Sequence, residues 1–258
     1  MAEYKNKRDR EFIPDENLVY GRNAVMELLN SGREIDKITV KKGEREGSIT
    51  TIVAIALKRK IPVVETEKAR LDAMCGTPNH QSVCATASAI EYVEIDDILN
   101  KAAELGQAPL IAILDGVDSP QNVGAVLRVC DCAGVHGVII PKRRAAQINS
   151  AAVKASAGAA SHVLCCRVSN IASTVELLKK KGVWTFAAEA GGMDFRKGDY
   201  KGPTAIVFGS EGEGVSRIVK EKCDFTVSIP MYGKVNSLNV SCASSVILTY
   251  AAMQKAER

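Results

Sequence analysis

The chain has 258 residues, 46% of them hydrophobic, which suffices for two modest domains with buried cores and excludes a disordered or fibrous protein. Its formal net charge of +4 does not by itself indicate a nucleic-acid-binding protein. No segment has the apolar length of a membrane span, and the first residues lack the apolar stretch of a signal peptide, so we expect a soluble, cytoplasmic protein.

The first part of the chain predicts a small α/β domain. Residues 1–15 carry charges of both signs without periodicity, and we expect a mobile tail there. Over residues 16–93 the hydrophobic pattern predicts helices at 22–32, 48–60 and 67–76, and strands at 36–42, 61–66 and 81–93. A linker over 94–106, with a helix at 96–106, follows.

The second part, residues 107–258, alternates strands and helices more clearly. Strands are predicted at 109–115, 137–141, 162–168, 183–190 and 204–210, and helices at 119–134, 149–158 and 171–182, with a long helix that starts near Asn239. Such alternation predicts a parallel sheet buried on both faces. Ligands of such sheets bind beyond the carboxyl ends of the strands, where three motifs lie.

The chain contains eight cysteines but no Cys-x-x-Cys pair, and it has only three histidines. With no export signal, we expect the cysteines to remain thiols and predict no metal site.

The first motif, "DGVDSPQNVGAVLR", starts a helix capped by Ser119 with Pro120 as its first residue. A polar stripe of Gln121, Gly124 and Arg128 would receive an anionic substrate, with the glycine allowing close approach. The alternative is a surface arginine paired with Asp131.

The second motif, "FGSEGEGV", has the glycine content of a phosphate loop but the order G-x-x-G-x-G. Glu211 and Glu213 would repel a pyrophosphate, so the motif favours a ligand that is cationic or lacks phosphate. The alternative is a tight turn with solvated glutamates.

The third motif, "IPMYGKVNSLNVSCASSVILTYAAMQ", joins an irregular apolar segment to the final helix. Capping that helix accounts for one of Ser237 and Asn239, but not for both. The helix has an apolar face with Ala243, Val246, Ile247, Tyr250 and Ala251, which is either core or a dimer surface.

A basic triplet, Lys142, Arg143 and Arg144, follows the strand at 137–141. Residues 95–258 hold nineteen basic and fifteen acidic side chains, whereas residues 1–94 hold fifteen of each. The triplet is either a solvated loop or a contact for RNA phosphates.

Together the three motifs resemble those of the SpoU (TrmH-like) RNA ribose 2′-O-methyltransferases. The stretch "AGVHGVIIPKRRAAQINSAAVKASAGAASHV" resembles the subgroup that methylates one guanosine in the peptidyl-transferase loop of 23S ribosomal RNA, as do "YGRNAVMELL" and "NHQSVCA" in the first domain. The likeness spans residues 18 to 253. One departure is His80-Gln81-Ser82, where the subgroup has His-Gln-Gly.

The resemblance implies a carboxyl-terminal SPOUT domain with a deep trefoil knot, S-adenosylmethionine as cofactor, and a homodimer packed through the knot. The small first domain would bind RNA, either 23S ribosomal RNA or a pre-ribosomal particle. The cofactor-binding residues carried over are Gly209, Ile229, Met231, Gly233 and Leu238. The catalytic residues carried over are Asn122, Arg128, Glu211, Ser237 and Asn239.

Within this resemblance, Arg128 would assist deprotonation of the ribose hydroxyl, bind a neighbouring phosphate or stabilise the forming alkoxide, and Glu211 would orient it. A methyltransferase for transfer RNA or another ribosomal site is an alternative. Another is an RNA-binding ribosome-assembly protein that retains the fold without catalysis. A dinucleotide oxidoreductase fits poorly, because no G-x-G-x-x-G follows the first strand.

Overall fold

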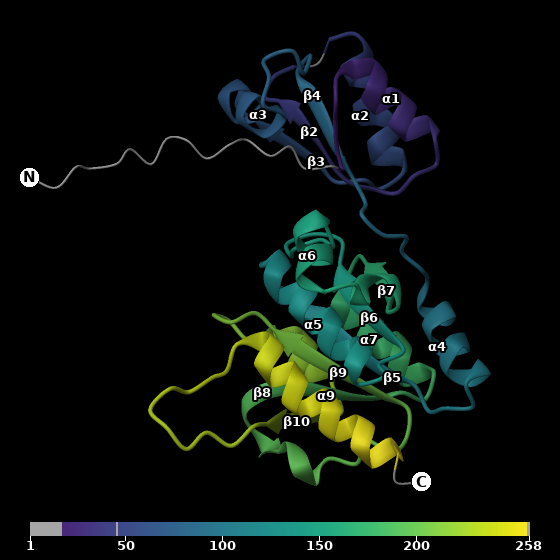
Figure 1. Ribbon diagram of the computed structural model, residues 1–258, viewed down its shortest axis with the longest axis vertical. Coiled ribbons are helices and arrows are strands. Elements are labelled where there is room, and N and C mark those ends of the chain that lie inside the picture. Colours follow the sequence, from purple (N-terminus) through teal and green to yellow (C-terminus); the bar gives the residue numbers. More distant parts are fainter. Residues whose placement is uncertain (1–16, 45, 257–258) are drawn as a thin grey trace, which may run out of the picture. The chain divides into compact units, whose positions relative to one another are not determined.

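The computed structural model describes residues 17–44 and 46–256, so the tail predicted over residues 1–15 lies outside the described residues. The chain forms two compact units that divide between Ser88 and Ala89 (Figure 1).

The first unit is a four-stranded sheet in the order β1-β4-β2-β3, covered by helices on both faces. Strands β2 and β3 are parallel, and the other pairs are antiparallel. Successive side chains of β4 point to opposite faces of the sheet and belong to two cores. Val83 and Ala85 pack with α1 and α2, whereas Cys84 packs with Leu71 of α3. The elements are β1 (Leu18–Tyr20), α1 (Arg22–Asn30), β2 (Ile35–Lys41), α2 (Ser48–Lys58), β3 (Val63–Thr66), α3 (Lys68–Cys75) and β4 (Val83–Ala87).

The second unit is a six-stranded parallel sheet in the order β10-β8-β9-β5-β6-β7. Its elements begin with α4 (Ile95–Glu104), β5 (Leu110–Asp115), α5 (Pro120–Cys132), β6 (Gly137–Pro141), α6 (Ser150–Ala155), β7 (Leu164–Val168) and α7 (Ile171–Lys180). They continue with β8 (Trp184–Asp194), β9 (Thr204–Gly209), α8 (Arg217–Lys222), β10 (Phe225–Ser228) and α9 (Val240–Ala256).

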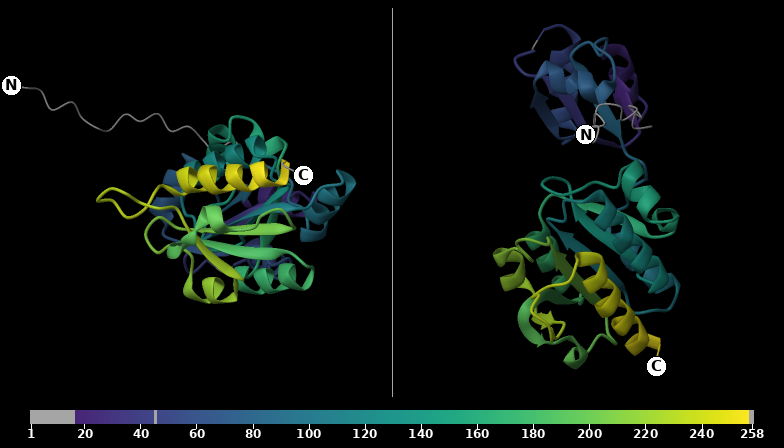
Figure 2. Two further views of the ribbon diagram at one scale, coloured as in Figure 1. Left: turned by 90° about the horizontal axis from the view of Figure 1, so that it is seen from below. Right: turned by 60° about the vertical axis from the view of Figure 1, so that its left-hand side comes forward.

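Both faces of this sheet are buried, as predicted. Ala112 and Leu114 of β5 belong to a core shared with α5, α6 and α9, while Ile111 and Ile113 belong to a core shared with α4, α7 and α8. Figure 2 shows α9 along one face of the strands, with helices on the opposite face. The predicted α/β fold with a parallel sheet is therefore confirmed.

The helix predicted within the linker packs as part of the second unit. Ile98 of α4 is fully buried in the core that α4 shares with α7 and α8. It fills the space over Gly137, where an added Cβ would lie 2.5 Å from Ile98 Cδ1. Val93 also bridges to Cys166 of β7. The division at Ser88 thus falls earlier than the predicted boundary at residue 93, because these contacts tie residues 93–104 to the second sheet.

Several elements differ from the prediction. β1, α8 and β10 were not predicted, since segments of three to six residues carry too little periodicity. β4 ends at Ala87 and not at residue 93, whereas β8 continues past residue 190 to pair with β10.

The carboxyl-terminal segment crosses from β10, at the edge of the sheet, to α9, which packs on α5 and beside β9. The knot implied by the resemblance stays a prediction. On α9, Ile247 and Ala251 are buried in the core, so the apolar face named from the sequence is largely core.

Candidate active site at the carboxyl edge of the second sheet

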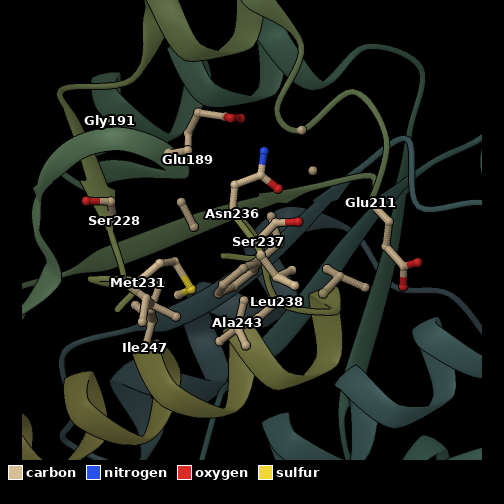
Figure 3. Close-up of a pocket in the computed structure, with 18 of the residues that line it drawn as sticks. Glu189, Gly191, Glu211, Ser228, Met231, Asn236, Ser237, Leu238, Ala243 and Ile247 are labelled. Atoms are coloured by element: carbon tan, nitrogen blue, oxygen red, sulfur yellow. The ribbon is translucent and has the colours of Figure 1, made fainter. Parts of the chain in front are cut away.

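The three motif segments leave the sheet at the same edge, because all six strands are parallel. The first follows β5 and starts α5, the second follows β9, and the third follows β10 and leads into α9. Two of these segments, the second and the third, surround a cavity of about 630 Å³ with the end of β8 (Figure 3).

The cavity combines apolar walls with main-chain and polar groups. Phe208, Val227 and Ile247 contribute apolar surface, and Glu189, Ser228 and Asn236 contribute polar side chains. The sequence assigned five residues to cofactor binding, and all of them line this cavity: Gly209, Ile229, Met231, Gly233 and Leu238. Glu211 and Ser237, assigned to catalysis, also line it, and Ser237 is exposed.

The glycine loop is closed by its own backbone. Ser210 N donates to Gly214 O at 3.2 Å, and Gly214 N donates to Ser210 O at 3.0 Å. An added Cβ on Gly209 would lie 1.9 Å from the carbonyl carbon of Gly214, so the turn requires a glycine at position 209. Gly214 has φ +67°, which also favours glycine.

A hydrogen-bond network joins the three motifs. Asn122 Nδ2 donates to Glu211 Oε1 at 2.7 Å, and Asn239 Nδ2 donates to Asn122 Oδ1 at 3.1 Å. Asn239 Nδ2 also donates to Glu211 Oε1. Figure 3 shows the Glu211 side chain directed away from the other labelled residues. Three of the five predicted catalytic residues are thus in direct contact.

Local structure fixes both asparagines. Ser119 Oγ accepts from Asn122 N at 3.4 Å and caps α5, which starts with Pro120 as predicted. Asn239 Oδ1 accepts from Ser241 N at 2.9 Å at the start of α9. Asn239 therefore both caps α9 and binds Glu211. Since Asn239 is the cap, the second polar residue, Ser237, is free to face the cavity.

Arg128 does not join this network. It is exposed on α5, makes no hydrogen bond or ion pair with any residue in 17–44 or 46–256, and does not line the cavity. The expectation that Glu211 orients Arg128 is not met, because the Glu211 carboxylate accepts from the two asparagines. The alternative pairing of Arg128 with Asp131 is absent too.

Gly124 has a different role from the one predicted. It is buried, and an added Cβ would lie 2.3 Å from Ala152 O and 2.6 Å from Ala155 Cβ of α6. The glycine allows two helices to approach closely, so the prediction that it admits a substrate was wrong. Sequence spacing identified the face of α5, but not the helix that covers it.

The basic triplet follows β6 at the same edge of the sheet. Lys142 N donates to Val168 O at 2.8 Å, while Arg143 and Arg144 are exposed. None of the three side chains forms an ion pair with a described residue, and none lines the cavity.

Glu189 was missed by the sequence reasoning. It lines the cavity, and its Oε2 accepts from Val215 N at 2.8 Å. The available signal was its place near the end of the predicted strand at 183–190, at the edge where ligands bind.

In the first unit, the departure His80-Gln81-Ser82 is accommodated with positive φ. Gln81 has φ +53° and Ser82 has φ +67°, a region where glycine is favoured. Ser82 Oγ donates to Glu44 Oε2 at 3.2 Å, and Gln81 Oε1 accepts from Arg22 N at 2.8 Å. These contacts hold the turn in a conformation that suits the glycine of the related motif.

No group of three or more His, Cys, Asp or Glu side chains in the described residues could hold a metal ion. All eight cysteines are free, and burial raises the pKa of the Cys84 and Cys165 thiols to about 12. Such thiols stay protonated and act as small apolar side chains. Among the helices of the described chain, none has the length and apolar character needed to cross a bilayer.

Comparison with known proteins indicates the family of the chain. The SpoU rRNA Methylase family matches residues 109–249, and a domain described as RNA 2′-O ribose methyltransferase substrate binding matches residues 18–93. A Bacillus subtilis protein assigned to the TrmH family of tRNA/rRNA methyltransferases is 41% identical over 231 residues, which cover 89% of this chain and 92% of that protein. A Staphylococcus saprophyticus protein with the same assignment is 42% identical, covering 91% and 94%.

Solved structures share the fold. The SpoU methyltransferase AviRb from Streptomyces viridochromogenes, crystallised with AdoMet, has a TM-score of 0.60 at 22% identity and covers 93% of this chain and 91% of its own. The TrmH/SpoU tRNA modifying enzyme of A. aeolicus has a TM-score of 0.54 at 31% identity, covering 62% of this chain and 85% of its own. The chain belongs to the SpoU/TrmH family of RNA methyltransferases.

Proposed function

We propose that this protein transfers a methyl group from S-adenosylmethionine to a ribose 2′-hydroxyl, with one guanosine in the peptidyl-transferase loop of 23S ribosomal RNA as its target. The observation that carries the proposal is the convergence of the Asn122–Glu211–Asn239 network with a cavity lined by all five predicted cofactor residues.

The residues that line the cavity suit the cofactor. Leu238, Val227 and Ile247 offer apolar surface for a flat ring, and the main chain at Gly209 and Ile229 offers hydrogen-bonding groups. The cofactor would supply an electrophilic methyl group on a sulfonium cation.

The chain's own residues would position the ribose and assist the loss of its proton. In-line attack requires the hydroxyl to be held toward the methyl group, a task suited to Ser237 and the asparagine amides. Arg128 is exposed and has no described partner, so its guanidinium is available to a phosphate or to the forming alkoxide. A guanidinium has five N–H donors and no acceptor, so it is suited to bind an anion and not to take the ribose proton.

RNA binding would involve both units. The first unit corresponds to a substrate-binding domain in sequence. Lys142, Arg143 and Arg144 lie at the same edge of the second sheet as the cavity and have no acidic partners among the described residues. We expect them to contact phosphates near the methylated nucleotide.

A homodimer through the second unit is also part of the proposal. One face of α9 remains exposed and carries no charge; its residues are Cys242, Ser245, Val246, Thr249 and Met253. Cys242, Val246, Thr249 and Met253 follow one another at three or four positions, and Ser245 adjoins Val246, so the five form one stripe on the helix. An uncharged stripe of this kind suits packing against a second copy.

The test is to incubate the purified protein with labelled S-adenosylmethionine and either undermodified 23S ribosomal RNA or transfer RNA. We expect label in the ribosomal RNA, and mass spectrometry should locate one new ribose methyl on a guanosine. Label in transfer RNA alone would support the alternative substrate, which the relatives' joint tRNA/rRNA designation keeps open. Label in neither RNA would refute the enzyme proposal and favour a non-catalytic RNA-binding role.

A further inference from the structure

Two consecutive backbone N–H groups after the glycine loop donate to carboxylates. Val215 N donates to Glu189 Oε2 and Ser216 N donates to Asp115 Oδ2, each at 2.8 Å. Glu189 lies in β8 and Asp115 is the last residue of β5, and these two strands flank β9 in the sheet. Val215 and Ser216, which follow the loop, are therefore held by the two strands on either side of β9, the strand that precedes the loop.

The Glu189 carboxylate also fits against the loop by shape. An added Cβ on Gly214 would lie 2.3 Å from Glu189 Oε2, so this oxygen occupies the space that a side chain would need. The Val215 side chain is 3% exposed and belongs to the core on the side of the sheet covered by α4, α7 and α8. The loop exit is thus fixed by packing and by two hydrogen bonds, while Glu211, Gly212 and Glu213 at its tip are exposed.

We propose that Glu189 and Asp115 are positioning residues that act as a clamp on the glycine loop and set the place of Glu211. Glu211 must reach Asn122 on α5 and Asn239 before α9, and its backbone lies only four residues before the first clamped N–H. A loop released at its exit would let Glu211 leave both asparagines. The role in catalysis rests on the proposed function, whereas the clamp itself does not.

Two conservative substitutions separate the clamp from an effect of charge. Glu189→Gln keeps the length and the acceptor oxygen but loses the charge. Glu189→Asp keeps the charge but is one methylene shorter, so its oxygen withdraws from Val215 N. A clamp predicts that Gln preserves function and Asp impairs it, whereas direct attraction of a cationic ligand predicts the reverse.

The first measurement is amide hydrogen exchange of the full chain without ligand, read at Val215 and Ser216 by NMR. In Glu189→Asp we expect the Val215 amide to exchange at least tenfold faster than in the unmodified protein, and in Glu189→Gln within about threefold of it. The pair Asp115→Ala and Asp115→Asn should give the same contrast at Ser216. Unchanged protection of Val215 in Glu189→Asp would overturn the clamp, even if the protein proves not to act on RNA.

The second measurement is methyl transfer at saturating RNA and cofactor. We expect kcat of Glu189→Asp to fall at least tenfold and kcat of Glu189→Gln to stay within about threefold, with the KM for RNA unchanged in both. Glu221→Asp and Glu221→Gln, on the exposed side of α8, are the matched controls and should leave kcat unchanged. A fall in Glu189→Gln larger than in Glu189→Asp would overturn the positioning role. If the unmodified protein transfers no methyl group, the proposed function fails while the exchange data still decide the clamp.

Discussion

Gly209→Ala tests whether the cavity depends on the closed turn of the glycine loop. The new Cβ would lie 1.9 Å from Gly214 C and 2.1 Å from Val215 N, and both are backbone atoms that no rotamer change can move. Carbon atoms in contact are separated by about 3.5 Å or more, so the backbone must shift by roughly 1.5 Å.

Such a shift breaks the two hydrogen bonds between Ser210 and Gly214. Each contributes about 0.5–1.5 kcal/mol, and overpacking costs about 1–3 kcal/mol, so the closed loop loses about 2–6 kcal/mol. Since the loop lines the cavity, a loss of about 2 kcal/mol lowers the affinity for S-adenosylmethionine roughly 30-fold. Titration calorimetry measures this affinity.

Gly212→Ala is the matched control. Gly212 lies in the same loop, but an added Cβ would meet no heavy atom within 4 Å and its φ is not positive. We expect its free energy of unfolding in urea to stay within about 0.5 kcal/mol of the unmodified protein. The steric reasoning would be refuted if the two alanine variants bound the cofactor equally well.

Three further substitutions test other parts of the site. Gly124→Ala should lower the free energy of unfolding in urea by about 1–3 kcal/mol, because its Cβ would collide with α6; unchanged stability would contradict the close helix contact. Arg128→Ala should reduce RNA methylation at least 100-fold while calorimetry shows intact cofactor binding, and loss of cofactor binding would count against its proposed role. Val246→Asp on the exposed stripe of α9 should weaken a homodimer at least tenfold in light-scattering measurements, whereas Ile218→Asp on α8 should not.

The sequence predicted the fold of the second unit well, because its strands are continuous apolar runs and its helices have clear periodicity. The short β10 was missed for want of such a signal, although it completes one wall of the cavity through Val227 and Ser228. The cofactor residues came from motifs that resemble a family, and the structure gathers them around one cavity.

The partners of the site residues were harder to predict than the residues themselves. Asn239 and Asn122 are 117 positions apart, and no local pattern indicates that their amides meet on one carboxylate oxygen. Gly124 shows the same limit, because its position on a helix face does not reveal whether solvent or α6 lies opposite. These contacts form when segments far apart in the sequence pack together. Hydrophobic periodicity describes each segment alone and does not show which segments meet.

The acidic glycine loop can now be understood through its hydrogen bonds. A phosphate loop must leave its backbone N–H groups free for the anion. Here Glu213 N and Gly214 N donate to Ser210, and the next two N–H groups donate to the carboxylates of Glu189 and Asp115. These four N–H groups are therefore not available to an anion, which adds to charge repulsion as a reason against a phosphate site. In the proposed clamp, the carboxylates of Glu189 and Asp115, which belong to the neighbouring strands and not to the loop, hold the loop in the shape that brings Glu211 to its two asparagines.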